Sequence, residues 1–218
     1  MQFEGYFLQL AHIFRYLVME LKRKIIVVAV LSSLIGKIHS QNFDIDLLHS
    51  INSGNSKSWD NTNKIFSASM TPVSIAAPVG LLAYGFFAHD SATKRNAIVV
   101  GAGLAASGII AVGMKYAIGR PRPFVTYPTL ITKKGEAGTP SFPSGHTSSA
   151  FATATSLSLC YPKWYVIAPS FLWASAVGYS RMELGVHYPS DVLVGAIIGS
   201  GCSWIAWKVN KRLAERKK

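Results

Sequence analysis

Charged residues are scarce in this chain of 218 residues. Only 15% of the residues are charged, whereas a soluble domain usually carries about 25%. Hydrophobic residues make up 50% of the chain and its mean hydropathy is +0.27. This balance favours a protein of the lipid bilayer, and the length suits one small bundle of membrane helices.

Acidic residues are scarcer than basic ones, with 10 Asp and Glu compared with 22 Lys and Arg. Between residue 100 and the basic C-terminal tail, the only carboxylates are Glu136, Glu183 and Asp191. Enzymes that use two metal ions surround those ions with several oxygen or nitrogen ligands. This part of the chain is poor in such ligands, so we expect no metal site and no cofactor.

Cysteine is nearly absent, and Cys160 and Cys202 both lie within apolar stretches. Their spacing fits neither a disulfide framework nor a zinc site, so they are expected to pack as small apolar side chains. The net charge of +12 is of a kind that can indicate nucleic-acid binding. No RNA- or DNA-binding motif accompanies it, and many cations flank apolar runs. We expect no nucleic-acid partner.

Residues 1–40 contain the parts of a secretory signal peptide. Translation from Met19 would place a basic triplet at 22–24 before a short apolar run at 25–36, with a cleavage point before Gln41. The run is short for a helix that spans a membrane, and an uncleaved anchor helix is the alternative. In either case the chain emerges on the far side of the membrane.

The rest of the chain divides into a polar segment, a bundle and a tail. Residues 41–64 are expected to be polar and exported, with a short amphipathic helix at 43–51 that lies on the membrane surface or on the bundle. Residues 65–210 form the bundle, and residues 211–218 form a basic cytoplasmic tail. The bundle holds uncharged runs rich in small residues, which pack closely in lipid, at 65–88, 97–114, 147–162, 164–180 and 192–207.

These runs predict an all-α fold, a polytopic membrane helical bundle with about five transmembrane helices after the signal or anchor segment. The alternative is a soluble helical protein with a core of small residues. Basic residues set the topology: Lys94 and Lys163 lie in short connections, which the positive-inside rule assigns to the cytoplasm together with the tail. Residues 41–64, 115–146 and 181–191 then share the outer face.

The first motif of the outer face covers residues 115–123. Arg120 and Arg122 each precede a proline, which favours extended backbone and holds the guanidinium groups at fixed positions. Arginine forks match phosphate oxygens, and Lys115 adds a third cation. The alternative is that these cations simply reach the membrane interface.

The second motif is Pro-Ser-Gly-His at residues 143–146, where the next run begins. Unpaired N–H groups at a helix start, with Ser144 and Gly145, make an anion site. His146 could serve there as a general acid near neutral pH. The alternative is a serine cap beside an incidental histidine.

The third motif holds Arg181, His187 and Asp191. Asp191 follows His187 by four residues, within reach if a helical turn forms there, and Pro189 suits the first turn of a helix. A carboxylate on one ring nitrogen fixes the tautomer and leaves the other nitrogen basic. His187 is therefore a candidate nucleophile toward phosphorus. The alternative is a structural His–Asp pair that caps a helix.

The order and spacing of the motifs, K-x6-RP, PSGH and SR-x5-H-x3-D, resemble the signature of the type 2 phosphatidic acid phosphatase superfamily, in its bacterial membrane lipid phosphatase branch. The match covers residues 115–191 without departure. The resemblance implies that His187 attacks phosphorus and forms a phosphohistidine, that His146 protonates the departing oxygen and then activates water, and that Asp191 holds His187. It implies a metal-independent reaction in which phosphate is bound by Lys115, Arg122, Ser144, Gly145 and Arg181. Arg120 is not a motif position, and we expect an auxiliary role for it at most.

The resemblance also implies a substrate. The substrate would be a lipid phosphate monoester or diphosphate, such as phosphatidic acid, phosphatidylglycerol phosphate, undecaprenyl diphosphate or a lipid A phosphate. Together with the topology given by the basic residues, it predicts an enzyme of the bacterial inner membrane with its active site on the periplasmic or extracellular face. The loop at 124–142 suits either lipid contact or ordinary solvation, through Tyr127, Leu130, Ile131, Lys133 and Lys134.

Two other functions remain open from the sequence. One is a soluble periplasmic acid phosphatase or an enzyme like the vanadate haloperoxidases, which share the same motifs. The other is a non-catalytic membrane protein that binds lipid through the same pocket.

Overall fold

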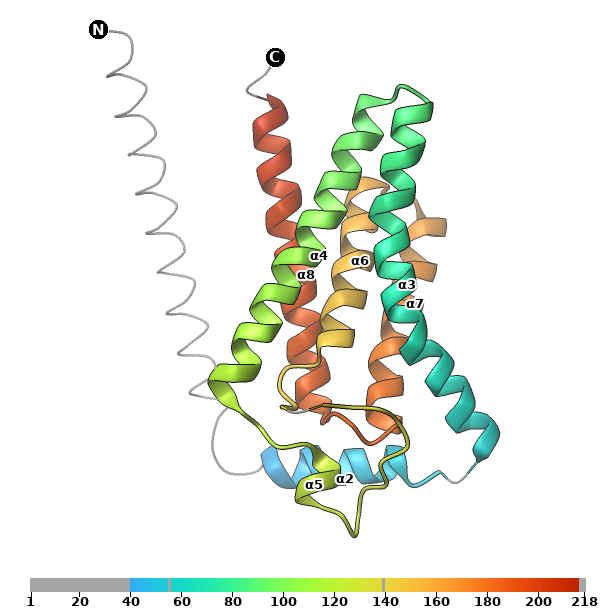
Figure 1. Ribbon diagram of the computed structural model, residues 1–218, viewed down its shortest axis with the longest axis vertical. Helices are drawn as coiled ribbons and strands as arrows, with labels where there is room; N and C mark the ends of the chain where they lie inside the picture. Colours follow the sequence, from blue (N-terminus) through green and yellow to red (C-terminus); the bar gives the residue numbers. More distant parts are fainter. Residues whose placement is uncertain (1–39, 55, 139, 216–218) are drawn as a thin grey trace, which may run out of the picture. The chain divides into compact units, whose positions relative to one another are not determined.

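The computed structural model describes residues 40–54, 56–138 and 140–215. These residues contain no β-strand, which confirms the predicted all-α fold (Figure 1). The predicted signal peptide or anchor and the start at Met19 lie outside the described residues. The helices are α2 (Ser40–Asn52), α3 (Lys57–Phe87), α4 (Ser91–Ile118), α5 (Pro123–Thr126), α6 (Gly145–Cys160), α7 (Trp164–Glu183) and α8 (Pro189–Glu215).

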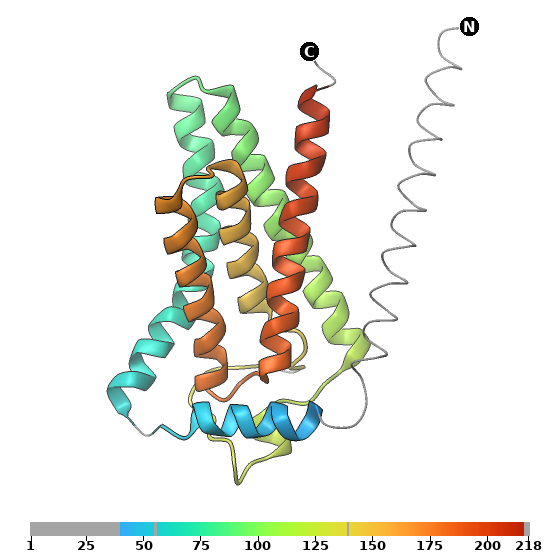
Figure 2. The ribbon, with the colours of Figure 1, turned by 180° about the vertical axis from the view of Figure 1, so that it is seen from behind.

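The five long helices α3, α4, α6, α7 and α8 run along one another (Figures 1 and 2). Within the described residues, three segments are long and apolar enough to cross a membrane: Lys57–Phe87, Ser91–Thr126 and Pro189–Glu215. A span needs about 20 apolar residues, and α6 and α7, with 16 and 20 residues, are the shortest helices of the bundle. The chain is a membrane protein, and length and composition support three of the predicted spans.

Small residues let α8 lie directly against α6. A Cβ atom added at Gly199 would lie 2.1 Å from the carbonyl oxygen of Ser148, and one at Gly195 would lie 2.6 Å from that of Ser144. Neither position therefore tolerates a side chain at the present helix spacing. This close approach holds the start of α6, which carries the second motif, beside the start of α8.

The turns and loops that connect the helices lie at two opposite ends of the bundle. The turns between α3 and α4 and between α6 and α7 lie toward the end where α8 finishes, whereas α2, α5 and the loops that carry the motifs lie at the other end (Figure 1). The three motifs therefore meet at one end and the basic connections at the other, as the charge distribution predicts. We call the first of these the motif end.

Helix α2 covers the motif end and confirms the helix predicted at 43–51. Its Leu48 is fully buried in a cluster with Ile131 and Tyr188. The amide of Asn52 donates to the carbonyl oxygens of Thr132, at 3.0 Å, and Glu183, at 2.7 Å. α2 is thus fixed to the loop between the first two motifs and to the end of α7.

The structure shows which residues of the loop at 124–142 are buried and which could contact lipid. Ile131 is only 3% exposed, so its side chain belongs to the core and does not face lipid. The ammonium group of Lys134 lies 2.7 Å from Glu183 and 3.0 Å from Asp60, which makes it part of an ion-pair network. Leu130 is exposed and remains a residue that could contact lipid.

Candidate active site

The third motif forms the end of α7, a short loop and the first turn of α8. Gly185 has a φ of 71°, a left-handed conformation that glycine adopts at little cost, and a Cβ atom there would lie 2.3 Å from a loop carbonyl oxygen. α8 begins at Pro189, so this proline lies in the first turn of a helix as predicted, and Asp191 lies in the same turn. The turn therefore brings the His187 ring above the start of α8, within reach of Asp191.

His187 and Asp191 form a buried pair, with side chains 2% and 0% exposed. His187 Nδ1 lies 3.3 Å from Asp191 Oδ2, and His187 Nε2 lies 2.8 Å from Nη1 of Arg122. A guanidinium group can only donate, so Nε2 accepts and the ring proton is on Nδ1, facing the carboxylate. These contacts favour the tautomer that the sequence predicts for a nucleophile.

The surroundings of His187 keep its ring neutral. Burial lowers the pKa of His187 to about 3, against the effect of Asp191, whose carboxylate raises it. Arg122 and Arg181 lower the pKa further, because their charges oppose a positive charge on the ring. At neutral pH the ring therefore keeps a lone pair on Nε2, which a nucleophile needs.

Asp191 uses both of its carboxylate oxygens. Oδ2 accepts from the Ser141 hydroxyl and, at 3.0 Å, from the backbone N–H of Tyr188, in addition to its contact with His187. Oδ1 accepts from Nη1 of Arg120 at 2.7 Å. With every side occupied, the carboxylate is held in one orientation.

The two predicted cations of the first motif bind neutral carbonyl oxygens. Nε of Arg122 donates to Gly138 at 2.7 Å and Nη1 donates to Val186 at 2.6 Å, while Nζ of Lys115 donates to Pro140 at 2.9 Å. Neither cation forms an ion pair with a carboxylate among the described residues. Their positive charges are therefore available to an anion.

The second motif forms the start of α6. Ser144 is the N-cap, and its hydroxyl oxygen accepts from the backbone N–H of Thr147 at 3.4 Å. The backbone N–H of Ser144 donates to the carbonyl oxygen of Asp191 at 3.0 Å, which joins this helix start to the His–Asp pair. A Cβ atom at Gly145 would meet nothing within 4 Å. The helix start therefore has open space beside the N–H groups that favour an anion.

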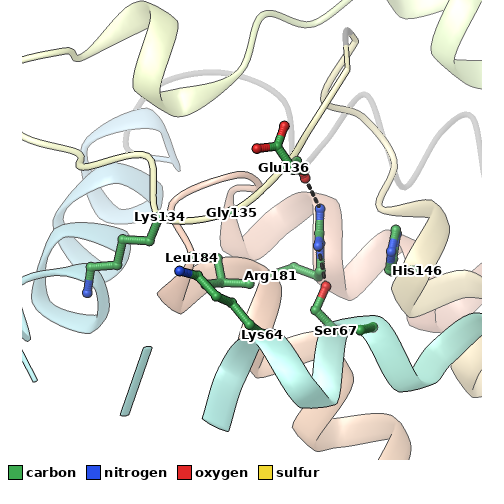
Figure 3. Close-up of a pocket in the computed structure, with 9 residues that line it drawn as sticks. Lys64, Ser67, Lys134, Gly135, Glu136, His146, Arg181 and Leu184 are labelled. Atoms are coloured by element: carbon green, nitrogen blue, oxygen red, sulfur yellow. Dashed lines mark hydrogen bonds between the residues drawn. The ribbon is translucent and has the colours of Figure 1, made fainter. Parts of the chain in front are cut away.

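Arg181 and His146 line a cavity of about 430 Å³ (Figure 3). Arg181 is only 4% exposed; its Nη1 donates to the Ser67 hydroxyl and its Nη2 to the carbonyl oxygen of Glu136 at 3.2 Å. Its Nε is buried with no hydrogen-bond partner among the described residues. Because a buried donor without a partner is costly, this group is suited to a ligand oxygen.

The predicted residues thus fall into two adjoining groups. His187 contacts both Asp191 and Arg122, whereas Arg181 and His146 lie at the cavity. The backbone N–H of His187 donates to the carbonyl oxygen of Arg181 at 3.2 Å and so joins the groups. No hydrogen bond within the described part of the chain joins His146 to His187 directly.

Three residues outside the predicted set complete the surroundings of Asp191: Asp44, Arg120 and Ser141. Arg120, for which an auxiliary role at most is expected, contacts Asp44 Oδ2 at 2.8 Å and Asp191 Oδ1 at 2.7 Å. The position of Arg120 before a proline, in a motif rich in cations, is the feature of the sequence that points to this residue. No pattern in the sequence pointed to Asp44.

A helical membrane bundle that presents a neutral buried histidine to arginines and a helix start has the parts that phosphoryl chemistry requires. The chain belongs to the PAP2 superfamily, whose family model matches residues 96–215. That match covers more than half of the chain and all three motifs, and it confirms the family resemblance seen in them.

Relatives and solved structures agree with this membership. Lipid A 4'-phosphatase of Bacteroides thetaiotaomicron is 36% identical over 75 residues, which are 34% of this chain and 33% of that protein. Undecaprenyl-diphosphatase of Sulfolobus acidocaldarius is 34% identical over 115 residues, 50% of this chain and 55% of that protein. The chain therefore spans less than two thirds of the length of either curated relative.

Two crystal structures share the fold. Aquifex aeolicus LpxE has a TM-score of 0.63 and 29% identity, over 75% of this chain and 93% of that one. The PAP2 type phosphatidylglycerolphosphate phosphatase of Bacillus subtilis has a TM-score of 0.67 and 20% identity, over 89% of this chain and 95% of that one. The second likeness supports the fold alone.

Proposed function

We propose that this protein is a membrane phosphatase that hydrolyses a lipid phosphate monoester or diphosphate through a phosphohistidine at His187. The observation that carries the proposal is the buried His187–Asp191 pair, with Nε2 of His187 2.8 Å from Arg122. A neutral histidine oriented by a carboxylate is a competent nucleophile. The guanidinium beside its reactive nitrogen is suited to hold the oxygens of a phosphate there.

In this proposal the substrate phosphate rearranges the contacts of Arg122. Its Nη1 now donates to His187 Nε2, and phosphate oxygens would take over this donor and leave the Nε2 lone pair directed at phosphorus. Lys115, Arg181, the Ser144 hydroxyl and the Gly145 N–H supply the remaining positive charge and donors. Fixed cations stabilise the charge of the transition state directly.

The reaction then proceeds in two steps. In the first, Nε2 of His187 forms a bond to phosphorus while the bond to the leaving oxygen breaks, and His146 gives that oxygen a proton. Burial and the charges of Arg181, Arg122 and Lys115 lower the pKa of His146 to about 4, and the negative charge of the bound phosphate opposes these effects and favours the protonated ring. In the second, neutral His146 takes a proton from water, the water oxygen bonds to phosphorus and the N–P bond breaks. Asp191 accepts the Nδ1–H bond throughout and balances the positive charge of the phosphorylated ring.

The proposed reaction uses no metal ion. Among the described residues, no three His, Cys, Asp or Glu side chains are grouped so that they could hold one. The cations Lys115, Arg122 and Arg181 would take the role that metal ions have in two-metal phosphatases.

We place the reaction on the periplasmic or extracellular face of a bacterial inner membrane, on the basis of the basic residues at the end opposite the motifs. The three apolar segments disfavour a soluble acid phosphatase or a haloperoxidase-like enzyme. The complete catalytic set disfavours a non-catalytic lipid-binding protein.

Carbonate extraction of membranes is expected to leave the protein in the pellet, and its release into the soluble fraction would contradict this location.

The substrate is tested with a panel of purified lipid phosphates in detergent micelles that contain EDTA. The panel holds phosphatidic acid, phosphatidylglycerol phosphate, undecaprenyl diphosphate and lipid A. We expect release of inorganic phosphate from at least one of them without added metal. The proposal fails if none releases phosphate, or if EDTA abolishes the release and a divalent ion restores it.

The cavity supports a finer proposal about the head group. Lys64 and Lys134 also line it (Figure 3). Lys134 is balanced by Glu183 and Asp60, whereas Lys64 is exposed and forms no ion pair with the described residues. A second anionic group beside the phosphate under attack would therefore face Lys64, as it would in a diphosphate.

Lys64→Gln is expected to lower kcat/KM for farnesyl diphosphate about five- to tenfold, because it removes one charge contact at a partly exposed site. The value for farnesyl phosphate, which has no second phosphate group, should change much less. Phosphate release from the two substrates measures the difference. Lys57→Gln, in the same helix and outside the cavity lining, is the control. Equal losses on both substrates would contradict the role of Lys64.

A further inference from the structure

Asp44 of α2 reaches the catalytic centre from outside the family-matched region. Its side chain is 8% exposed and it precedes residue 96, where the match to the PAP2 superfamily begins. Oδ1 of Asp44 accepts from the backbone N–H of Ser190 at 2.9 Å, and Oδ2 accepts from the Ser190 hydroxyl at 2.5 Å. Asp44 thus binds the residue next to Asp191 in the first turn of α8.

Arg120 joins Asp44 to Asp191. Its Nη2 lies 2.8 Å from Asp44 Oδ2, and its Nη1 lies 2.7 Å from Asp191 Oδ1 and 2.7 Å from the Ser190 hydroxyl oxygen. The guanidinium carbon lies 3.7 Å from the centroid of the Tyr188 ring, a distance at which a cation is attracted to an aromatic face. Because the planar guanidinium group of Arg120 is held along both edges and on one face, it keeps a single orientation.

Arg120 and Arg122 therefore differ in whether a carboxylate neutralises their charge. Arg120 lies between two carboxylates, so its charge is already compensated, in contrast to Arg122, whose hydrogen bonds go to carbonyl oxygens and the His187 ring. Arg120 is therefore unsuited to bind the substrate phosphate. Its contact with Asp191 Oδ1 instead leaves Oδ2 to face His187.

We propose that Asp44 and Arg120 are positioning residues, which set the orientation of the Asp191 carboxylate and through it that of the His187 ring. The inference rests on the proposed role of His187 as nucleophile. Asp44 holds Arg120 from α2, and Arg120 holds the oxygen of Asp191 that His187 does not use. Helix α2 thereby helps to position the catalytic residues.

Asp44→Asn is expected to lower kcat for dioctanoyl phosphatidic acid about ten- to a hundredfold, because small errors in the position of a nucleophile slow the chemical step by such factors. KM should stay within about twofold, because neither residue contacts the phosphate. Asp46→Asn, in the same helix and exposed, is the matched control and should keep the wild-type kcat. If the lipid panel shows a better substrate, the same comparison is made with it.

A merely structural role is excluded by two further measurements. The rate at which label from the substrate enters the protein should fall with kcat, while thermal unfolding of Asp44→Asn in detergent follows that of Asp46→Asn. The double variant Asp44→Asn/Arg120→Gln should be no slower than Arg120→Gln alone, because both changes break one chain of contacts.

Some results would overturn the proposal. An unchanged kcat in Asp44→Asn, a rise in KM at constant kcat, or additive losses in the double variant would each contradict it. Should Asp44→Asn fail to fold, Arg120→Lys takes its place, because it keeps the charge and loses the fork; an unchanged kcat there would equally refute the positioning role. Activity of the wild type, abolished in His187→Ala, shows that a failure concerns Asp44 and Arg120 and not the proposed reaction.

Discussion

His187→Ala is expected to release phosphate from its lipid substrate at least about a thousandfold more slowly than the wild type, because loss of a covalent nucleophile removes the first chemical step. The remaining cations would still bind the substrate. Lys115, Arg122 and Arg181 do not depend on the imidazole for most of their hydrogen bonds. The loss should therefore lie in kcat, with KM changed little.

The control for this variant is a histidine far from the motifs. His89 lies exposed in the turn between α3 and α4, with a φ of 51°, a conformation that asparagine tolerates. His89→Asn should keep full activity. Turnover of His187→Ala at the rate of His89→Asn, with both proteins folded, would refute His187 as the nucleophile.

Gly199→Ala is expected to lower the free energy of unfolding by about 3 kcal/mol or more, at the upper end of the cost of overpacking. The added Cβ atom would lie 2.1 Å from the carbonyl oxygen of Ser148 and 2.8 Å from the backbone nitrogen of Ala152. Both atoms are backbone, so no side chain can move aside and α6 must separate from α8. Because α6 begins with the second motif, activity should fall as well.

Gly201→Ala is the matched control, two residues further along α8. A Cβ atom there meets nothing within 4 Å, so the stability should change by no more than about 1 kcal/mol, the scale of helix propensity. Thermal or denaturant unfolding of both variants in one detergent makes the comparison. Equal stability of the two would show that α6 and α8 do not pack as closely as described.

The sequence predicted the parts of the site whose signals are local. The four-residue spacing of His187 and Asp191, with Pro189 between them, predicted a pair at a helix start, and the structure has α8 begin at Pro189 with the two side chains in contact. Ser144 was placed at a helix start and is the N-cap of α6. Local spacing and capping rules suffice for such features.

Contacts that depend on tertiary packing could not be predicted in this way. Asp44 meets Arg120 across 76 positions of sequence, and nothing in a polar segment singles out one aspartate among several. The sequence did not decide whether Ile131 and Lys134 contact lipid or solvent. In the structure Ile131 packs against α2 and Lys134 pairs with Glu183 of α7, so both side chains have structural contacts. Such pairings emerge only when the chain is folded.

The measurement that tests the account most directly is transfer of phosphate from substrate to protein. The enzyme is mixed with phosphatidic acid labelled in its phosphate, or with the best substrate of the panel, and quenched rapidly in alkali, which preserves phosphohistidine. We predict a labelled peptide that contains His187, with label that acid removes, and no label in His187→Ala. Turnover without any labelled protein, or label that persists in His187→Ala, would contradict the proposed mechanism.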